Sequence, residues 1–326
     1  MSEVKVREVQ PGIFVIHLPL PMRPTIVNVT LLHSAGEWAL IDTGVCTSDS
    51  RDALTAALRQ VGCAPEKISK LISTHHHPDH FGSSKAYKEL TGAAVYLHPL
   101  EYEASKSYAP KGRSDEAIRF FLQHGIPLHR FVKVPSPGEF WDKLYVPTAP
   151  DHFIDDGDVI SVGGFELEVI TTPGHTPGHC VLYLRQQHLM IVGDHLLPKI
   201  TPHVGIFPGG PTNPLADFIA SQRKVQRFDV NLVLPAHGGV YSDHRHRANQ
   251  IIQHHYYRMQ EMLDTIRRQP RTAYDVATIA FGFDSDSPLT VQFPATFETL
   301  AHLEYLRMAG KAAREQREEQ SFYRAI

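Results

Sequence analysis

Residues 71–82 read LISTHHHPDHFG, an apolar run that passes directly into a turn rich in ionisable side chains. The run is typical of a buried strand, and His75, His77, Asp79 and His80 follow it at the spacing H-x-H-x-D-H. Imidazole nitrogens and carboxylate oxygens are the ligands that zinc and related metals prefer. Because side chains at i and i+2 of an extended segment point the same way, His75 and His77 can share one metal. Asp79 and His80, where the chain turns into a helix, point elsewhere and can serve a second metal.

Composition describes an ordinary globular protein with one unusual feature. The chain has 326 residues, of which 42% are hydrophobic and 21% charged, and this length fits one large domain with an appendage, or two domains. The net charge of −3 gives no basic footprint for nucleic acid or for a membrane surface. The 21 histidines are many for this length and call for a chemical explanation.

The sequence predicts a cytoplasmic location. Residues 1–12, MSEVKVREVQPG, have no apolar core of a secretory signal. No apolar run reaches the roughly 18–20 residues that span a bilayer, so no membrane association is expected. Cys46, Cys63 and Cys180 form no CxxC pair, and an odd number of cysteines argues for a reducing compartment.

The periodicity predicts a mixed α+β chain of two similar halves, with helices outside two packed sheets. Expected strands lie at 12–18, 26–33, 37–44, 68–74, 93–98, 158–162, 165–171, 180–185, 188–193 and 230–238, and expected helices at 48–61, 82–90 and 214–227. Residues 99–150 interrupt this order with two expected helices, 100–107 and 114–124, and a proline-rich tract. We interpret them as an insertion over the sheet edge.

The character of the chain changes after residue 242. Expected helices at 243–268, 272–281 and 295–309 precede a charged tail that can form a hairpin. Three helices and a small hairpin are a winged-helix arrangement. The sequence therefore predicts a catalytic domain at 1–245 and a winged-helix-like domain at 246–326.

Three further turns carry metal-ligand residues, each directly after an apolar run. They are TTPGHTPGH at 171–179, GDH at 193–195 and PAHG at 235–238. A sheet presents chemistry at one edge in this way. Any one of these turns could contain His or Asp by chance, but the full ordered set points to a metal centre.

The ordered motifs IDTG, THxHxDH, PGHTPGH, GD and AHG closely resemble those of the metallo-β-lactamase superfamily, over residues 12–242. The resemblance implies a four-layer αββα sandwich with a helical insertion at about 99–150. The C-terminal region resembles the winged-helix appendage of one branch, which has glyoxalase II-like and endoribonuclease relatives.

The resemblance also implies roles for individual residues. One metal is held by His75, His77 and His175, a second by Asp79, His80 and His237, and Asp194 bridges both. Asp79 and Asp194 are the implied catalytic carboxylates, and Asp42 is a buried carboxylate that orients the histidine turn. His76, His179 and His195 adjoin ligands and are expected behind them or in solvent.

The implied activity is that of a binuclear metal-dependent hydrolase that uses a metal-bridging hydroxide on a carboxylic ester, thioester or lactone. Zn²⁺ is the default expectation for both ions, and iron or manganese fit the same ligands. One alternative is a single-strand endoribonuclease or phosphodiesterase, but Lys106, Lys111 and Arg113 form only a small basic group. A second alternative is a non-catalytic binding protein on the same fold.

Substrate contacts are expected from two segments. His203 and Phe207, in the loop 196–213, are candidate substrate-binding residues for a small acyl-type molecule. The aromatic residues of the insertion either line a pocket or pack it onto the core; they are Tyr108, Phe120, Phe121, Phe131, Phe140, Trp141 and Tyr145. The helix at 295–309 carries Glu298 and Glu304 against one Arg307, so it is expected to pack or to form a homodimer rather than to read DNA.

Overall fold

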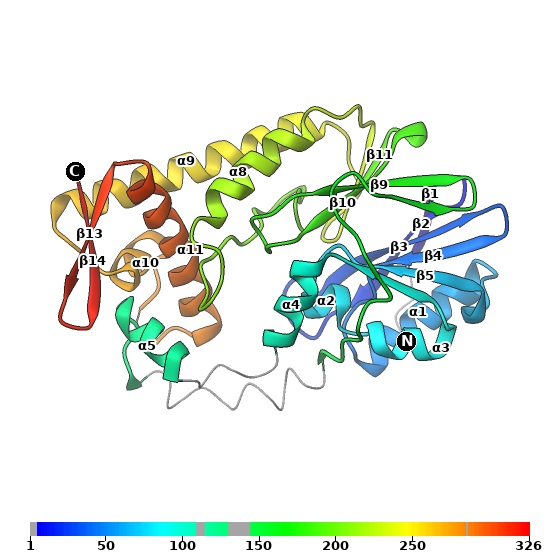
Figure 1. Ribbon diagram of the computed structural model, residues 1–326, viewed down its shortest axis with the longest axis horizontal. Helices are drawn as coiled ribbons and strands as arrows, with labels where there is room; N and C mark the ends of the chain where they lie inside the picture. Colours follow the sequence, from blue (N-terminus) through cyan, green and yellow to red (C-terminus); the bar gives the residue numbers. More distant parts are fainter. Residues whose placement is uncertain (1–4, 109–114, 130–143, 285) are drawn as a thin grey trace. The chain divides into compact units, whose positions relative to one another are not determined.

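The computed structural model describes residues 5–108, 115–129, 144–284 and 286–326 (Figure 1). Lys111, Arg113, Phe131, Phe140, Trp141 and the side chain of Tyr108 lie outside the described part. The chain divides into two compact units, and each is built from three segments. The first comprises 1–109, 138–202 and 224–247, and the second comprises 110–137, 203–223 and 248–326.

Two sheets form the first unit. The first sheet has the order β1-β2-β3-β4-β5-β6-β7, with β1 Val6–Gln10, β2 Ile13–Pro19, β3 Ile26–Ser34, β4 Glu37–Ile41, β5 Ile68–Ile72, β6 Ala94–Leu97 and β7 His152–Phe153. The second has the order β12-β11-β10-β9-β8, with β8 Val159–Val162, β9 Phe165–Thr171, β10 Cys180–Leu184, β11 Leu189–Gly193 and β12 Leu232–Pro235.

Side-chain alternation along the strands divides the core of this unit into two layers. On β2, Ile13 and Val15 pack between the two sheets against residues of the second sheet such as Leu182, while Ile16 and Leu18 point to the opposite face. A strand buried on both faces therefore needs the nearly continuous apolar sequence that this chain supplies.

Helices cover that opposite face. They are α1 Ser48–Gln60, α2 Pro78–Phe81 and α3 Ser84–Thr91. On α1, Leu54, Ala57 and Leu58 lie at helical spacing in the same core cluster as the strand residues. Thr47 caps the helix, because its side chain accepts a hydrogen bond from the N–H of Ser50 at 3.2 Å. The predicted α+β arrangement, with sheets flanked by helices, is confirmed.

Strand direction brings the motif-bearing turns to shared edges. β4 and β5 run parallel, so Asp42 and the histidine turn follow adjacent carboxyl ends. β11 and β12 also run parallel, so Asp194 and His237 follow neighbouring ends. β9 is antiparallel to β10, which is antiparallel to β11, so the turn at 171–179 leaves the same edge as Asp194.

The second unit is helical with one hairpin. Its elements include α5 Asp115–Gln123, α10 Ala273–Phe281, α11 Leu289–Met308 and the hairpin of β13 Ala312–Arg317 and β14 Gln320–Ala325. α8 Pro214–Val225 and α9 His244–Arg268 each begin in one unit and end in the other, and α4 Pro99–Tyr108 belongs to the first unit. Among the described residues, no helix is long and apolar enough to cross a membrane.

The aromatic residues of the insertion pack rather than line a pocket, where they are described. Phe121 stacks on Phe293 and Phe297, with ring centroids 5.6 and 5.5 Å apart, and Phe120 lies against Phe297 at 6.4 Å. Tyr145 is buried in the core of the first unit. Of the two alternatives, packing onto the core thus describes Tyr145, whereas Phe120 and Phe121 pack within the second unit.

Two strands were not expected from the sequence, and one helix begins well before its expected start. β1 was not expected, because its sequence VREVQ is mostly polar and only half-buried, and β7 was not expected because it has two residues. α11 begins at Leu289, six residues before the expected Ala295, and contains Pro294. Proline usually marks a first turn because it lacks an N–H, but here it lies at an exposed position within the helix.

The helix that would read nucleic acid in a winged helix is largely buried. Residues 299–304 of α11 are all buried, and successive residues of an α-helix point about 100° apart. The helix therefore offers no continuous open face for a nucleic-acid groove. Glu304 is buried, whereas Arg307 is partly exposed. The winged-helix assignment and the boundary at 245/246 stay predictions.

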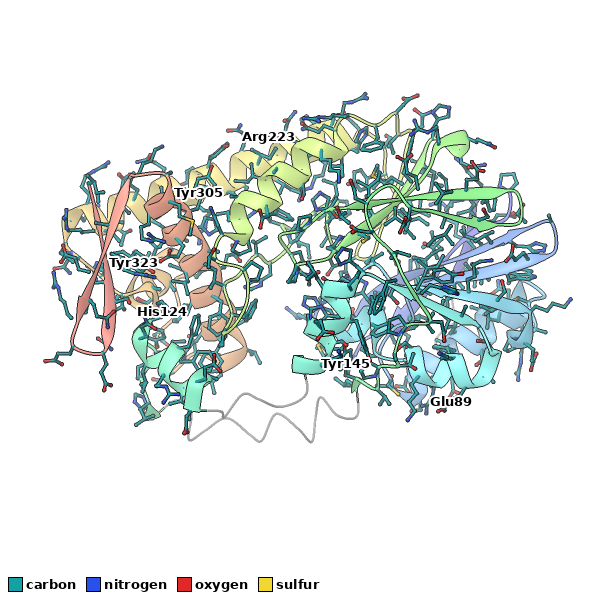
Figure 2. The ribbon with its side chains drawn as sticks, in the orientation of Figure 1. Glu89, His124, Tyr145, Arg223, Tyr305 and Tyr323 are labelled. Atoms are coloured by element: carbon teal, nitrogen blue, oxygen red, sulfur yellow. The ribbon has the colours of Figure 1, made fainter. Side chains whose placement is uncertain are left out.

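Glu304 joins α11 to the terminal hairpin. Its Oε1 accepts hydrogen bonds from Tyr323 Oη at 2.6 Å and Arg314 Nη1 at 2.9 Å, and its Oε2 accepts one from Arg307 Nε at 2.7 Å. Tyr323 is fully buried, and Figure 2 labels it at the terminal hairpin. Removing the carboxylate would leave this hydroxyl without an acceptor.

We expect Glu304→Ala to lower the free energy of unfolding of the chain by about 2–3 kcal/mol, the range for losing hydrogen bonds to a charged group. Urea unfolding followed by circular dichroism measures this change. Glu319→Gln, at an exposed position of the hairpin turn, is the matched control and should shift stability by less than about 0.5 kcal/mol. Equal midpoints for the two variants would contradict this role of Glu304.

Candidate metal centre

Seven side chains from four turns gather in two groups within the first unit. The ligand atoms of His75, His77, His175 and Asp194 lie within 4.8 Å of one another, and those of Asp79, His80 and His237 do likewise. The structure thus brings together all seven residues that the sequence singled out.

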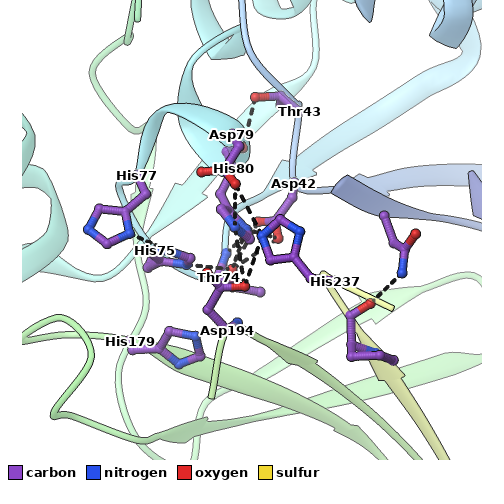
Figure 3. Close-up of polar contacts among 12 residues, drawn as sticks. Asp42, Thr43, Thr74, His75, His77, Asp79, His80, His179, Asp194 and His237 are labelled. Atoms are coloured by element: carbon purple, nitrogen blue, oxygen red, sulfur yellow. Dashed lines mark hydrogen bonds and ion pairs between the residues drawn. The ribbon is translucent and has the colours of Figure 1, made fainter. Parts of the chain in front are cut away.

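Asp194 lies between the two groups. Its Oδ2 is 3.6 Å from His175 Nε2 in the first group. Its Oδ1 is 3.4 Å from His237 Nε2 and 3.6 Å from His80 Nε2 in the second. One carboxylate therefore presents one oxygen to each group, and Figure 3 shows it beside His80 and His237.

The inward-facing nitrogens are fixed by hydrogen bonds on the other side of each ring. His80 Nδ1 donates to Asp42 Oδ2 at 2.8 Å, and His237 Nδ1 donates to the carbonyl of Ile26 at 2.8 Å. These bonds occupy Nδ1 of both rings and direct Nε2 into the site, which is the arrangement that metal-binding histidines adopt.

Strand β3 holds the turn that carries His237. The Asn28 side chain donates to the carbonyls of Pro235 at 2.8 Å and Gly238 at 2.7 Å, and its backbone N–H donates to the carbonyl of Ala236 at 2.7 Å. Three hydrogen bonds from one residue on a central strand leave the turn little freedom. No pattern in the sequence pointed to this role for Asn28.

Asp42 connects the strand edge to one ligand group directly and to the other through Thr74. The carboxylate accepts from the Thr74 N–H at 2.8 Å and from the Thr74 hydroxyl at 3.0 Å, as well as from His80. The same hydroxyl is 3.1 Å from His75 Nδ1. It can therefore accept a hydrogen bond from the Nδ1–H of His75 while it donates its own proton to Asp42. The predicted orienting carboxylate thus reaches His80 directly and His75 through one hydroxyl.

The chemistry of the centre suits cations. Burial would raise the pKa of Asp194, but His237, His80 and His175 around it hold that pKa well below its usual range. Burial would lower the pKa of His80, yet Asp79, Asp42 and Asp194 hold it well above 6.5. A group of three carboxylates that draws a proton onto a buried imidazole attracts positive charge in general.

Two histidines of the first group favour the neutral form. Burial, reinforced by the neighbouring histidines, lowers the pKa of His75 and His77 well below 6.5, and a neutral imidazole is the form that binds a metal. His80 Nε2 and Asp194 Oδ1 are buried and make no hydrogen bond. A buried polar atom without a hydrogen bond needs another partner, and the residues present therefore fit a pair of divalent ions.

The three neighbouring histidines do not lie in solvent. His179 is fully buried, and both its ring nitrogens are in use: Nδ1 is 2.9 Å from the Thr172 hydroxyl, and Nε2 accepts the N–H of Asp194 at 3.2 Å. His195 is buried against His179, with ring centroids 6.0 Å apart. His76 is buried and its Nδ1 lies 2.5 Å from Glu101 Oε2. All three stand behind the ligands, and the solvent alternative is wrong.

His203 and Phe207 belong to the second unit. His203 Nε2 is 2.9 Å from the carbonyl of Pro294 on α11, and the Phe207 ring lies 5.0 Å from that of Phe297. Phe207 is 44% exposed. Both residues therefore line α11, and their contact with substrate stays a prediction.

Comparison with known proteins decides the family. The Metallo-beta-lactamase superfamily matches residues 22–237, more than half of the chain. The chain belongs to this superfamily. A second family, described as the metallo-beta-lactamase-like C-terminal domain, matches residues 259–324.

Solved metallo-beta-lactamase structures cover nearly the whole chain. A metallo-beta-lactamase family protein from Thermus thermophilus is 31% identical, with a TM-score of 0.84 over 98% of this chain and 100% of that one. A beta-lactamase domain protein from Burkholderia ambifaria is 26% identical, with a TM-score of 0.85 over 99% of this chain and 94% of that one. Among curated relatives, the acyl-coenzyme A thioesterase MBLAC2 of Gallus gallus is 26% identical over 228 residues, 67% of this chain and 74% of that protein.

The role of Thr74 gives a test of this metallo-beta-lactamase site. Thr74→Val removes the hydroxyl that joins Asp42 to His75, and we expect it to weaken divalent metal affinity roughly 10–100-fold, as losing a partner of a ligand does. Thr74→Ser keeps the hydroxyl and should stay close to wild type. Zinc competition with a chromogenic chelator measures the affinities, and indistinguishable Val and Ser variants would refute the link.

Proposed function

We propose that this metal-dependent hydrolase of the superfamily is binuclear and acts on a carboxylic ester, thioester or lactone. The observation that carries the proposal is the position of Asp194, with one oxygen toward His175 and the other toward His80 and His237. A carboxylate shared by two ligand groups is suited to hold two ions close together.

The ligand assignment follows from the two groups. His75, His77 and His175 would hold one ion, Asp79, His80 and His237 the other, and Asp194 both, with Zn²⁺ our first choice and iron or manganese as alternatives. When bound, such a pair supplies Lewis acidity for the substrate carbonyl and lowers the pKa of water toward neutrality.

The chain's own groups have distinct tasks in this proposal. Asp42 and the Ile26 carbonyl keep the Nδ1 protons of His80 and His237 away from the centre. Asp79 and Asp194 are the carboxylates at the reacting atoms. We assign acceptance of the proton of the attacking water to Asp79, because its side chain is 23% exposed and that of Asp194 12%. Addition of water to the carbonyl carbon and cleavage of its C–O or C–S bond, with the proton passing from Asp79 to the leaving oxygen or sulfur, then give a carboxylic acid and an alcohol or thiol, or a single hydroxy acid from a lactone.

Two observations favour an acyl substrate over nucleic acid. A relative that matches over most of its length bears the name acyl-coenzyme A thioesterase. The α11 helix, which would read nucleic acid in a winged helix, is buried on successive residues around its axis. We keep His203 and the exposed Phe207 ring as proposed contacts for the acyl group, and cytoplasmic location and homodimer formation as further proposals.

An activity panel tests the proposal. The metal-reconstituted protein is assayed on thioesters, esters, lactones, β-lactams and a phosphodiester, beside His77→Ala and the control His129→Ala, an exposed histidine of the second unit. We expect turnover of an acyl substrate, a loss of kcat/KM beyond about a hundredfold in His77→Ala, because a ligand should matter more than the partner of a ligand, and no change in His129→Ala.

The other outcomes separate the alternatives. Turnover of the phosphodiester alone, abolished in His77→Ala, would identify an endoribonuclease-type enzyme. Wild type and His77→Ala equally inert on every substrate would favour a non-catalytic binding protein on this fold.

A further inference from the structure

Glu101 is a fully buried carboxylate in the first turn of α4, outside both ligand groups. Its Oε2 accepts from the His76 backbone N–H at 2.9 Å and from His76 Nδ1 at 2.5 Å. Its Oε1 accepts from the Gly178 N–H at 2.6 Å. Both oxygens are therefore engaged by N–H donors, and the carboxylate is not arranged as a metal ligand.

These donors belong to two separate turns of the metal centre. His76 stands between His75 and His77 in the first turn, and Gly178 is three residues after His175 in the second. These two turns carry His75, His77 and His175, whose imidazoles belong to the first ligand group. One buried side chain thus spans the two segments whose separation defines that group.

The second turn is also packed tightly against the start of α4. A Cβ on Gly178 would lie 2.2 Å from Nδ1 of His98, and this nitrogen already accepts the Leu100 N–H at 3.1 Å. The ring cannot move away without losing that bond, so only glycine fits at 178. The backbone of Gly178 therefore packs against the ring of His98, the residue before α4, in addition to its hydrogen bond to Glu101.

The second ligand group has different supports. His80 is held by Asp42 and His237 by the Ile26 carbonyl, and no contact of Glu101 described above touches these residues. A change at Glu101 should accordingly act on one group and spare the other.

We propose that Glu101 is a positioning residue that sets the spacing of His75 and His77 relative to His175, and thereby the metal affinity of the first ligand group alone. The proposal rests on the binuclear site proposed above. Replacing the carboxylate by an amide should loosen this spacing, because the amide nitrogen takes the place of one carboxylate oxygen and cannot accept the hydrogen bond of the turn that it faces. The loss should resemble that of other partners of ligands, roughly 10–100-fold in affinity.

Variants in which only one ligand group remains intact make the test specific. His237→Ala impairs the second group and leaves the first intact, whereas His175→Ala does the reverse. Glu101→Gln is introduced into each background and into wild type, and Zn²⁺ affinity is measured by chelator competition. We expect a roughly 10–100-fold loss in the His237→Ala background, no change in the His175→Ala background, and weakening of one of two equivalents in wild type.

A matched control lies on the same helix. Glu103 is exposed and pairs with Lys106 at 2.6 Å, so Glu103→Gln removes the same charge without touching either turn and should leave every affinity unchanged. Gly178→Ala displaces the second turn by a different route, the clash with the His98 ring, and should reproduce the selective loss, which keeps the test open if Glu101→Gln folds poorly. Thermal unfolding of the metal-free variants monitors folding.

The outcomes are distinct. Equal weakening in both backgrounds, or no weakening in the His237→Ala background by either Glu101→Gln or Gly178→Ala, overturns the positioning role. If the wild-type protein binds fewer than two equivalents of each of the three metals, Zn²⁺, Fe²⁺ and Mn²⁺, the binuclear proposal itself is overturned, irrespective of Glu101.

Discussion

The hydrogen bonds of Asp42 are the constraint on which the centre depends. This buried residue has a backbone φ of 62°, a left-handed conformation that few side chains other than Asp and Asn adopt readily. The turn directs its carboxylate across from β4 to the end of β5, where it binds Thr74 and His80. Because Thr74 also meets His75, one carboxylate fixes a ring in each ligand group. Strand pairing places the two ends side by side, and Asp42 then determines which ring nitrogens remain open.

The two sheets contribute unequal shares of the centre. The first sheet supplies four ligands from one turn, and the second supplies His175, Asp194 and His237 from three turns whose strands point to the same edge. The inter-sheet core of branched aliphatic residues keeps these edges together. Gly193, with φ 48°, lies so close to Thr74 and His179 that a Cβ would approach both within 2.8 Å. The close approach of backbone and side chains here explains why a glycine precedes Asp194.

The sequence was informative where chemistry has a fixed period or a characteristic residue type. Alternation along an extended segment separated His75 and His77 from His76, and apolar runs located the strands that deliver the other ligands. It was silent where the partner lies far along the chain: Glu101 looks like any acidic residue in a first helical turn, and Asn28 like a polar residue in a strand. The start of α11 was misplaced because Pro294 is normally a boundary, and its burial around the axis followed from tertiary packing that no local pattern encodes.

The interleaving of the two units along the chain has a consequence for biosynthesis. Phe121 packs on Phe293 and Phe297, so the apolar face of α5 has to wait for a partner made much later. About 170 residues separate them, which corresponds to roughly 10–30 s on the ribosome at typical elongation rates. During that interval the strands of the first unit can form, while the apolar face of α5 remains exposed and prone to aggregation. A chaperone that shields short aromatic stretches would be most useful to this protein at that stage, and no single cut of the chain would yield the first unit free of the second.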